Sequence, residues 1–178
     1  MSTAVQHIII KIAIFWVLFL ILHFSYDWIK TPLVAVFSGT NESFMQHAKI
    51  GFLAYSLASI AEFFLWGSQA SSPGSFLYAR LVTSMALPWV MFIVYYTAPA
   101  FYGKPMPTIP LEIVYANIIL LVIGVILALF EPGLETITYS LRGEIILWSL
   151  WVLGLVEMVI FTFRPPWADF FRSDFEGK

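Results

Sequence analysis

The sequence contains no cysteine, which excludes disulfide bonds, thiolate metal ligands and cysteine nucleophiles. Any metal ligand must therefore be a histidine or a carboxylate. Charge is also scarce: charged residues make up 11% of the 178 residues, the formal net charge is −2, and no run is rich in Lys and Arg. Because nucleic-acid binding needs a basic surface to neutralise phosphates, no nucleic-acid partner is expected.

Several familiar motifs are missing as well. The sequence has no phosphate-binding loop, no HExxH helix and no GxSxG elbow. The apolar run at 8–22 is not preceded by a basic segment or followed by a small-x-small cleavage pattern, so a cleaved signal peptide is not expected.

Hydrophobic residues are abundant, at 60% of the chain, and they gather in five long segments. These segments lie near 8–28, 46–66, 78–99, 111–130 and 144–163. Each approaches the roughly 20 residues that a helix needs to cross a bilayer core of about 30 Å. The sequence therefore predicts an all-α, polytopic transmembrane helix bundle in the cell membrane. Residues 1–178 are expected to form a single integral membrane domain that ends in a short, charged, cytoplasmic tail from Ala168.

The basic residues predict how the bundle is oriented. With five spans, the first loop, the third loop and the C-terminus share one side of the membrane. That side carries Lys30, Lys49, Lys104, Arg164, Arg172 and Lys178, whereas the other side carries Lys11, Arg80 and Arg142. The positive-inside rule then places the N-terminus outside and the C-terminus in the cytoplasm. Lys49 and Arg164 are interpreted as residues that snorkel to the lipid interface.

Short breaks and polar caps punctuate the apolar segments. The piece LVAVF at 33–37 is too short to span and is expected to be re-entrant or interfacial. Asn41 is predicted to cap the next helix, with Glu42 in its first turn. Pro88 is expected to kink the third segment, and EPGLE at 131–135 is expected to form a turn after the fourth.

Polar residues concentrate between the first two spans. His23 and Asp27 are four residues apart, as are Ser43 and His47, so each pair shares one helix face. Helix topology brings these ends together on one side of the membrane. The predicted polar pocket comprises His23, Asp27, Asn41, Glu42, Ser43, His47, Glu112 and Glu157. Two interpretations of the histidines remain open: ligands of a divalent metal, with His23, Asp27 and His47 as its set, or interfacial hydrogen-bonding groups.

Glu62 is a second buried acid in a different place. It lies 15 residues after His47, which puts it about 22 Å deeper toward the opposite membrane face. Arg80 or Arg142 is the expected partner there. We expect Glu62 and Glu157 to be protonated unless each has found a cation, because burial disfavours a charged carboxylate.

At these residues the sequence resembles a family of small bacterial integral membrane proteins classed as a domain of unknown function. The family pattern is roughly H-F-x-Y-[DE]-W, then F-x-x-x-N-E-S-x-W-E-H-x-K, with a late P-P-H. The positions that match are His23, Tyr26, Asp27, Trp28, Phe37, Asn41, Glu42, Ser43, His47 and Lys49, and more loosely Glu62, Pro165 and Pro166. Met45, Gln46 and Trp167 depart from it, where the family more often has Trp, Glu and His. The resemblance implies a shared fold and a shared polar pocket, and it implies no activity.

Three functions follow as hypotheses. The first is transport of a small solute or proton-coupled transport, because acids at two depths favour a relay. The second is a metal-dependent membrane enzyme acting on a lipid-like substrate, with Glu42 or Glu157 as general base. The third is an accessory subunit of a larger membrane complex, and a homo-oligomer is a further expected assembly.

Overall fold

The computed structural model describes residues 3–70, 72–103, 106–168 and 171, and these residues are almost entirely helical. The described residues contain no β-strand and form the following helices: α1 (Thr3–Trp28), α2 (Pro32–Phe37), α3 (Phe44–Trp66), a 3-10 turn (Gly67–Gln69), α4 (Pro73–Tyr102), α5 (Ile109–Glu135) and α6 (Leu141–Phe163). Of the charged tail predicted from Ala168 onward, the structure describes Ala168 and Phe171 only. Lys104, Arg172 and Lys178 also lie outside the described residues.

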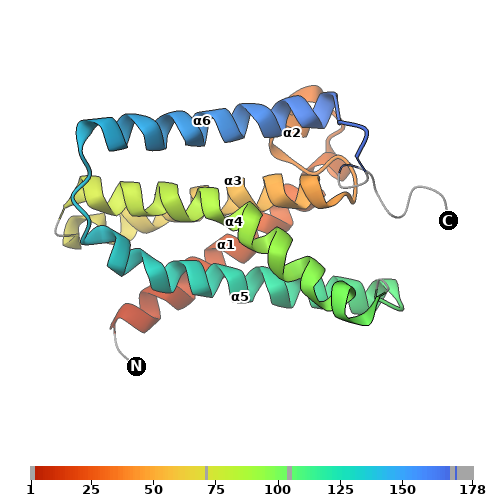
Figure 1. Cartoon of the computed structure of the whole chain (residues 1–178), viewed down its shortest axis with the longest axis horizontal. Coiled ribbons are helices and arrows are strands. Elements are labelled where there is room, and N and C mark those ends of the chain that lie inside the picture. The colour runs from red at the N-terminus through yellow and green to blue at the C-terminus, as the bar shows by residue number, and fades with distance from the viewer. Residues whose placement is uncertain (1–2, 71, 104–105, 169–170, 172–178) are drawn as a thin grey trace.

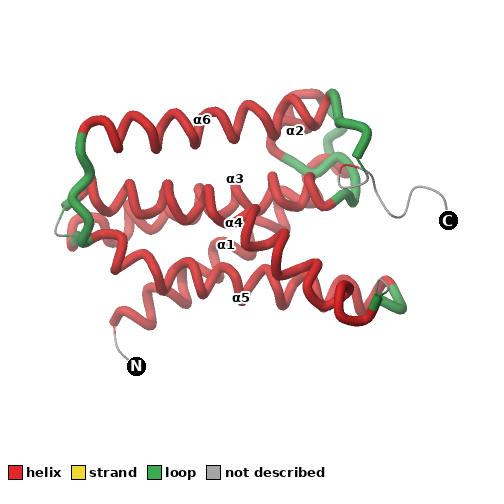
Figure 2. Tube along the Cα trace, in the orientation of Figure 1, coloured by secondary structure: helices red, strands yellow, loops and turns green. Residues whose placement is uncertain are grey.

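Five of the helices, all except α2, are long and apolar enough to cross a membrane, which confirms the predicted polytopic helix bundle. The connections gather at the two ends of the bundle (Figure 2). The C-termini of α1 and α4 and the N-termini of α3 and α5 lie at one end (Figure 1). The loop after α3 and the loop after α5 lie at the other end.

The core lies where α1, α3, α4 and α5 pack together. Phe15 of α1 and Tyr55 of α3 are fully buried, and their rings meet edge to face at 5.3 Å. Gly124 of α5 lies against the same phenyl ring: a Cβ atom at Gly124 would be 3.0 Å from Cε1 of Phe15. The absence of a side chain there lets α1 and α5 approach closely. In contrast, α6 lies along the outside of the bundle (Figure 1), and none of its described residues is buried.

The start of α3 corrects one prediction. Asn41 is not the helix N-cap; α3 begins at Phe44, and the Ser43 hydroxyl accepts a hydrogen bond from the Gln46 amide. Instead, the side-chain oxygen of Asn41 accepts a hydrogen bond of 3.0 Å from the Ser43 amide in the turn before the helix. Since Ser43 supplies the cap two residues later, Glu42 lies in the loop before the helix, where it is free of helical backbone geometry.

Prolines shape α4 and α5 differently. Figure 1 shows α4 bending near its middle, where Pro88 removes one helical hydrogen bond, as predicted. The predicted turn at 131–135 is wrong, because α5 continues through Pro132 to Glu135. The buried contacts of Glu131, described below, hold this last turn in the helix despite the proline.

The LVAVF piece and Pro32 before it form the six-residue helix α2, which is capped by the Thr31 hydroxyl accepting a hydrogen bond from the Val34 amide. Lys49 of α3 donates to the Ala35 carbonyl of α2 at 2.8 Å and to the Thr162 hydroxyl of α6 at 2.7 Å. Lys49 is fully buried, so the prediction that it snorkels to the lipid interface is wrong. Its ammonium group instead ties two peripheral helices to α3.

Candidate functional site

Two histidines meet where α1 ends and α3 begins. Because the two helices are antiparallel neighbours, the end of one faces the start of the other, and the ring centroids of His23 and His47 are 5.1 Å apart. Glu42 reaches between them from the loop before α3. Its carboxylate oxygens lie 3.8 Å from His23 Nε2 and 3.4 Å from His47 Nε2. We call these three residues the His–Glu cluster.

The ring of His47 is oriented by the backbone of its own helix cap. Its Nδ1 lies 2.9 Å from the Ser43 carbonyl oxygen. A carbonyl only accepts, so this contact puts a proton on Nδ1 and directs Nε2 toward Glu42; Nε2 donates to the carboxylate when the ring is protonated and offers its lone pair to an ion when the ring is neutral. Metal-binding histidines usually have such an arrangement, in which the outer ring nitrogen donates to a carbonyl and the inner one binds the ion.

One donor atom from each residue of the His–Glu cluster can be chosen so that all three lie within 4.8 Å of one another. Two imidazole nitrogens and a carboxylate oxygen form a ligand set that suits zinc and other divalent transition metals. Within the described part of the chain, His23 Nδ1 is buried and lacks a hydrogen-bond partner. The geometry thus presents three ligands to a common centre and leaves further coordination positions open.

Electrostatics favour an anionic Glu42. The hydrogen bond with His47 holds the pKa of the Glu42 carboxyl below its ordinary value, and the nearby histidine charges act in the same direction. Partial burial raises this pKa, but its effect is smaller than that of the hydrogen bond with His47. Glu42 is therefore poised to serve as an ionised ligand at neutral pH.

The His–Glu cluster forms one polar wall of a cavity of about 560 Å³ between α1, α3, α4 and α5. The other walls are mainly aromatic and aliphatic: Phe19, Leu20, Phe24, Phe44, Met91, Tyr95, Tyr96, Ile109, Ile113, Ala116 and Leu120. A second polar point comes from Glu112, which accepts a hydrogen bond from the Tyr95 hydroxyl at 2.5 Å. The bend in α4 precedes Met91 and Tyr95, so the second half of that helix supplies this wall.

The structure separates the remaining predicted site residues. Asn41 and Ser43 shape the loop that carries Glu42, and Glu112 lines the cavity. Asp27 lies exposed at the end of α1, one turn beyond His23, and does not line the cavity. Glu42 rather than Asp27 therefore joins the two histidines. Glu157 lies exposed on α6 and also lies outside the cavity lining.

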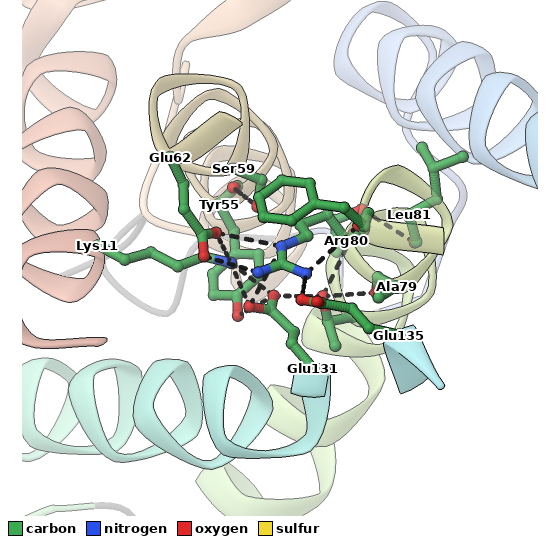
Figure 3. Close-up of polar contacts among 12 residues, drawn as sticks. Lys11, Tyr55, Ser59, Glu62, Ala79, Arg80, Leu81, Glu131 and Glu135 are labelled. Atoms are coloured by element: carbon green, nitrogen blue, oxygen red, sulfur yellow. Dashed lines mark hydrogen bonds and ion pairs between the residues drawn. The ribbon is translucent and has the colours of Figure 1, made fainter. Parts of the chain in front are cut away.

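Glu62 lies near the opposite end of the bundle, in a dense cluster of charged groups (Figure 3). Its carboxylate is paired with Arg80 at 2.7 Å and with Lys11 at 2.7 Å. The expected cationic partner Arg80 is thus present, and Lys11 of α1 is a second one. Arg80 also pairs with Glu135. We call Lys11, Glu62, Arg80, Glu131 and Glu135 the ion-pair cluster.

Glu131 is the most enclosed carboxylate of the ion-pair cluster, with 2% of its side chain exposed. Lys11 Nζ lies 2.6 Å from both of its oxygens, and the hydroxyls of Tyr55 and Thr83 each donate to it at 2.9 Å. These partners were not predicted, because Pro132 and Gly133 indicate a turn at Glu131. The available signal was that Lys11 interrupts an apolar span and Glu131 directly follows one, and charges so placed need partners.

A smaller cavity of about 230 Å³ lies beside the ion-pair cluster. Its wall includes His7, whose ring stacks on Trp66 with centroids 4.2 Å apart. The third histidine of the chain is thus at the opposite end of the bundle from the His–Glu cluster. It provides a natural control for substitutions of His23 and His47.

Residues 1–178 match the family described as "Family of unknown function (DUF6512)", so the chain belongs to this family. No curated protein and no solved structure matches the chain. The family match covers both polar clusters and all the spanning helices.

Proposed function

We propose that this protein is a metal-dependent membrane enzyme that hydrolyses a lipid-like substrate at the His–Glu cluster. The observation that carries the proposal is the convergence of His23, Glu42 and His47 on one point of a large, mostly apolar cavity. A divalent ion there would have three protein ligands and open positions facing the cavity. Catalytic zinc sites share this pattern of three ligands with one position open to water or substrate.

The chemistry that such an ion supplies is activation of water at neutral pH and polarisation of a carbonyl or phosphoryl oxygen. Glu112 is suited to accept the proton of the attacking water, since Glu42 and Glu112 are the two carboxylates among the described cavity-lining residues. Tyr95 holds the Glu112 side chain by its hydroxyl. This assignment replaces Glu42 and Glu157 as general base, because Glu42 faces both histidines and Glu157 lies outside the cavity.

The transport hypothesis has less support. It rested on Glu62 and Glu157 as two proton carriers at different depths. Glu62 is enclosed by two cations, and Glu157 lies on the exposed surface of α6. A relay would need groups that can gain and lose protons along a connected path. An accessory-subunit role draws its support from α6, whose described residues are all at least partly exposed.

The positive-inside rule supports placing the His–Glu cluster at the cytoplasmic end of the bundle. On this proposal the N-terminus is outside and the active site faces the cytoplasmic leaflet. Of the six basic residues counted for this side, Lys30, Lys49 and Arg164 are described, and all three are near this end.

The test uses the full chain purified in lipid nanodiscs, stripped with a chelator and titrated with Zn²⁺. A fluorogenic long-chain ester, 4-methylumbelliferyl palmitate, reports hydrolysis. We expect one tight Zn²⁺ site per chain and zinc-dependent ester cleavage. His47→Ala should lose both, whereas His7→Ala should keep both, because His7 lies at the other end of the bundle.

Glu112→Gln separates binding from chemistry. We expect it to bind Zn²⁺ as the wild type does and to lose hydrolysis by roughly 10²-fold or more, the usual contribution of a general base. Hydrolysis that is equal in wild type and His47→Ala would overturn the assignment of the site. Zinc binding without hydrolysis of ester or phosphoester lipids would overturn the hydrolytic function and leave only a metal site.

A further inference from the structure

α1 crosses α5 obliquely and packs tightly against it near the middle of both helices. The side chains of Ile12 and Phe15 lie so close to Gly124 that a Cβ atom there would be 3.1 Å and 3.0 Å from them, and Lys11 pairs with Glu131 two turns further along α5. Figure 1 shows α1 crossing α5 obliquely, so the two helices diverge on either side of this contact, including toward the end that carries the His–Glu cluster. The cavity lies in this widening gap, with residues 19–24 of α1 on one side and residues 109–120 of α5 on the other.

The rim of the cavity is part of the membrane-facing surface. Phe24, Ile109 and Ile113 line the cavity, yet they are 43%, 54% and 56% exposed. All three belong to helices that can span a membrane, and all three are apolar. A side chain that lines a cavity and is also exposed marks its mouth, so the cavity opens sideways between α1 and α5 as well as toward the His–Glu cluster.

A polar bridge closes the deep end of this mouth. Trp16 of α1 donates from its indole nitrogen to the Asn117 side-chain oxygen of α5 at 3.0 Å. Asn117 also lines the cavity, and its amide nitrogen donates to the Ile113 carbonyl at 2.8 Å, which fixes the side chain. The opening is therefore bounded by this bridge in the span and by the His–Glu cluster at the helix ends.

The interior beyond the mouth is suited to hydrocarbon. Leu120 and Met91 line the inner wall and are 2% and 6% exposed, so they are hidden from the surrounding bilayer. Apart from Asn117, whose side-chain oxygen and nitrogen are both hydrogen-bonded, the polar groups of the cavity named above lie at the His–Glu cluster and at Glu112 with Tyr95. The cavity is thus polar at one end and apolar toward the span, like a membrane lipid.

We propose that the α1–α5 opening is a lateral portal through which a bilayer lipid inserts one acyl chain, presenting its headgroup linkage to the His–Glu cluster. The inference rests on the proposed function for the identity of the site, and it names the substrate class: an acyl lipid taken from the membrane. A water-soluble substrate would have no need of an apolar mouth within the span. The chain enters between Phe24 and Ile113 and ends against Leu120 and Met91.

The test is photolabelling of the full chain in nanodiscs of phosphatidylcholine, a fraction of which carries a diazirine in one acyl chain. Lipid-facing residues of every span will be labelled from the bulk bilayer, so the informative positions are the buried ones. We expect label on Leu120 and Met91, mapped by mass spectrometry. Ile123 and Leu87 are also buried, with 0% exposed, but do not line the cavity, and they should remain unlabelled.

Substitutions sharpen the result. Ala116→Trp places an indole in the cavity and should reduce the labelling of Leu120 and Met91 by about tenfold, a loss of about 1.4 kcal/mol in binding. Val114→Trp on the same helix is the matched control, since Val114 is exposed and does not line the cavity; labelling should be unchanged. Absence of label on Leu120 and Met91 in the wild type, or equal labelling in Ala116→Trp, would overturn the portal.

The two proposals fail in different ways. Labelling of Leu120 does not require the metal, so it should persist in His47→Ala. Labelling that persists while zinc binding is absent from the wild type would refute the proposed enzyme and leave a lipid-binding cavity. Zinc-dependent hydrolysis without label on the inner wall would refute the portal alone.

Discussion

Lys11→Met should strongly destabilise the protein, because Lys11 is the main counter-charge of a buried carboxylate. Its side chain is 1% exposed, and its ammonium group contacts both oxygens of Glu131 and one of Glu62. The described ion-pair cluster contains two cations and three carboxylates, so this substitution increases its excess negative charge from one to two. Removing one partner of a buried ion pair costs about 3–5 kcal/mol.

For a chain of this length, each kcal/mol shifts the melting temperature by roughly 2–4 °C, which predicts a decrease of about 6–20 °C. The seven tryptophans allow the transition to be followed by intrinsic fluorescence in detergent. The double variant Lys11→Met/Glu131→Gln removes both charges and keeps an acceptor for the Tyr55 and Thr83 hydroxyls. We expect it to recover most of the lost stability. A melting temperature of Lys11→Met within about 1 °C of wild type, or a double variant as unstable as the single one, would refute this reasoning.

Three further predictions follow from packing, exposure and charge. Gly124→Ala should destabilise the protein by about 1–3 kcal/mol, because the new methyl group meets Phe15 at 3.0 Å. Gly154→Ala should stabilise it by roughly 0.5–1 kcal/mol, because a Cβ atom there meets nothing within 4 Å. Thermal melts of the two variants compare a crowded helical glycine with an open one. Glu157→Gln should change the free energy of unfolding by less than about 0.5 kcal/mol and leave zinc binding intact, because Glu157 is exposed and lies outside the cavity. Loss of zinc binding by this variant would contradict the placement of Glu157 outside the site. The pKa of Glu42 is lowered in the folded protein, so the stability that its ionised form contributes is complete above the pKa of the unfolded chain and is lost as the pH falls through the lower folded pKa. The difference in melting temperature between wild type and Glu42→Gln should therefore shrink in acid. A difference that grows in acid would contradict this prediction.

Hydropathy was enough to predict the spanning helices, since each holds a long apolar run that survives errors of several residues at its ends. The ends themselves were harder. Pro132 favoured a turn at 131–135, but the buried contacts of Glu131 keep the helix intact. Such long-range contacts have no local sequence signature, because Lys11 and Glu131 are 120 residues apart.

Sequence spacing pointed to His23 and His47 as neighbours but could not choose the carboxylate between them. Asp27 shares a helix face with His23, and that periodicity favoured it as a ligand. The choice depends on where α3 starts: with the cap at Ser43, Glu42 remains in the loop and turns toward both rings. A cap at Asn41 would have placed Glu42 in the first helical turn.

The exposed position of Glu157 illustrates a second limit of sequence reasoning. A carboxylate inside an apolar segment indicates a polar site only if its helix is packed within the bundle. Here α6 lies outside, and that arrangement follows from tertiary packing rather than from the composition of α6.

The central claim, that His23, Glu42 and His47 bind one divalent ion, is tested most directly by X-ray absorption spectroscopy of the zinc-loaded protein. We predict a first shell of nitrogen and oxygen ligands at about 2.0–2.2 Å, with the scattering of two imidazole rings. The spectrum should be unchanged in His7→Ala, and His23→Ala and His47→Ala should each lose the bound zinc and with it the two-imidazole signal. A zinc spectrum without imidazole scattering, or one that survives both cluster substitutions, would contradict the account.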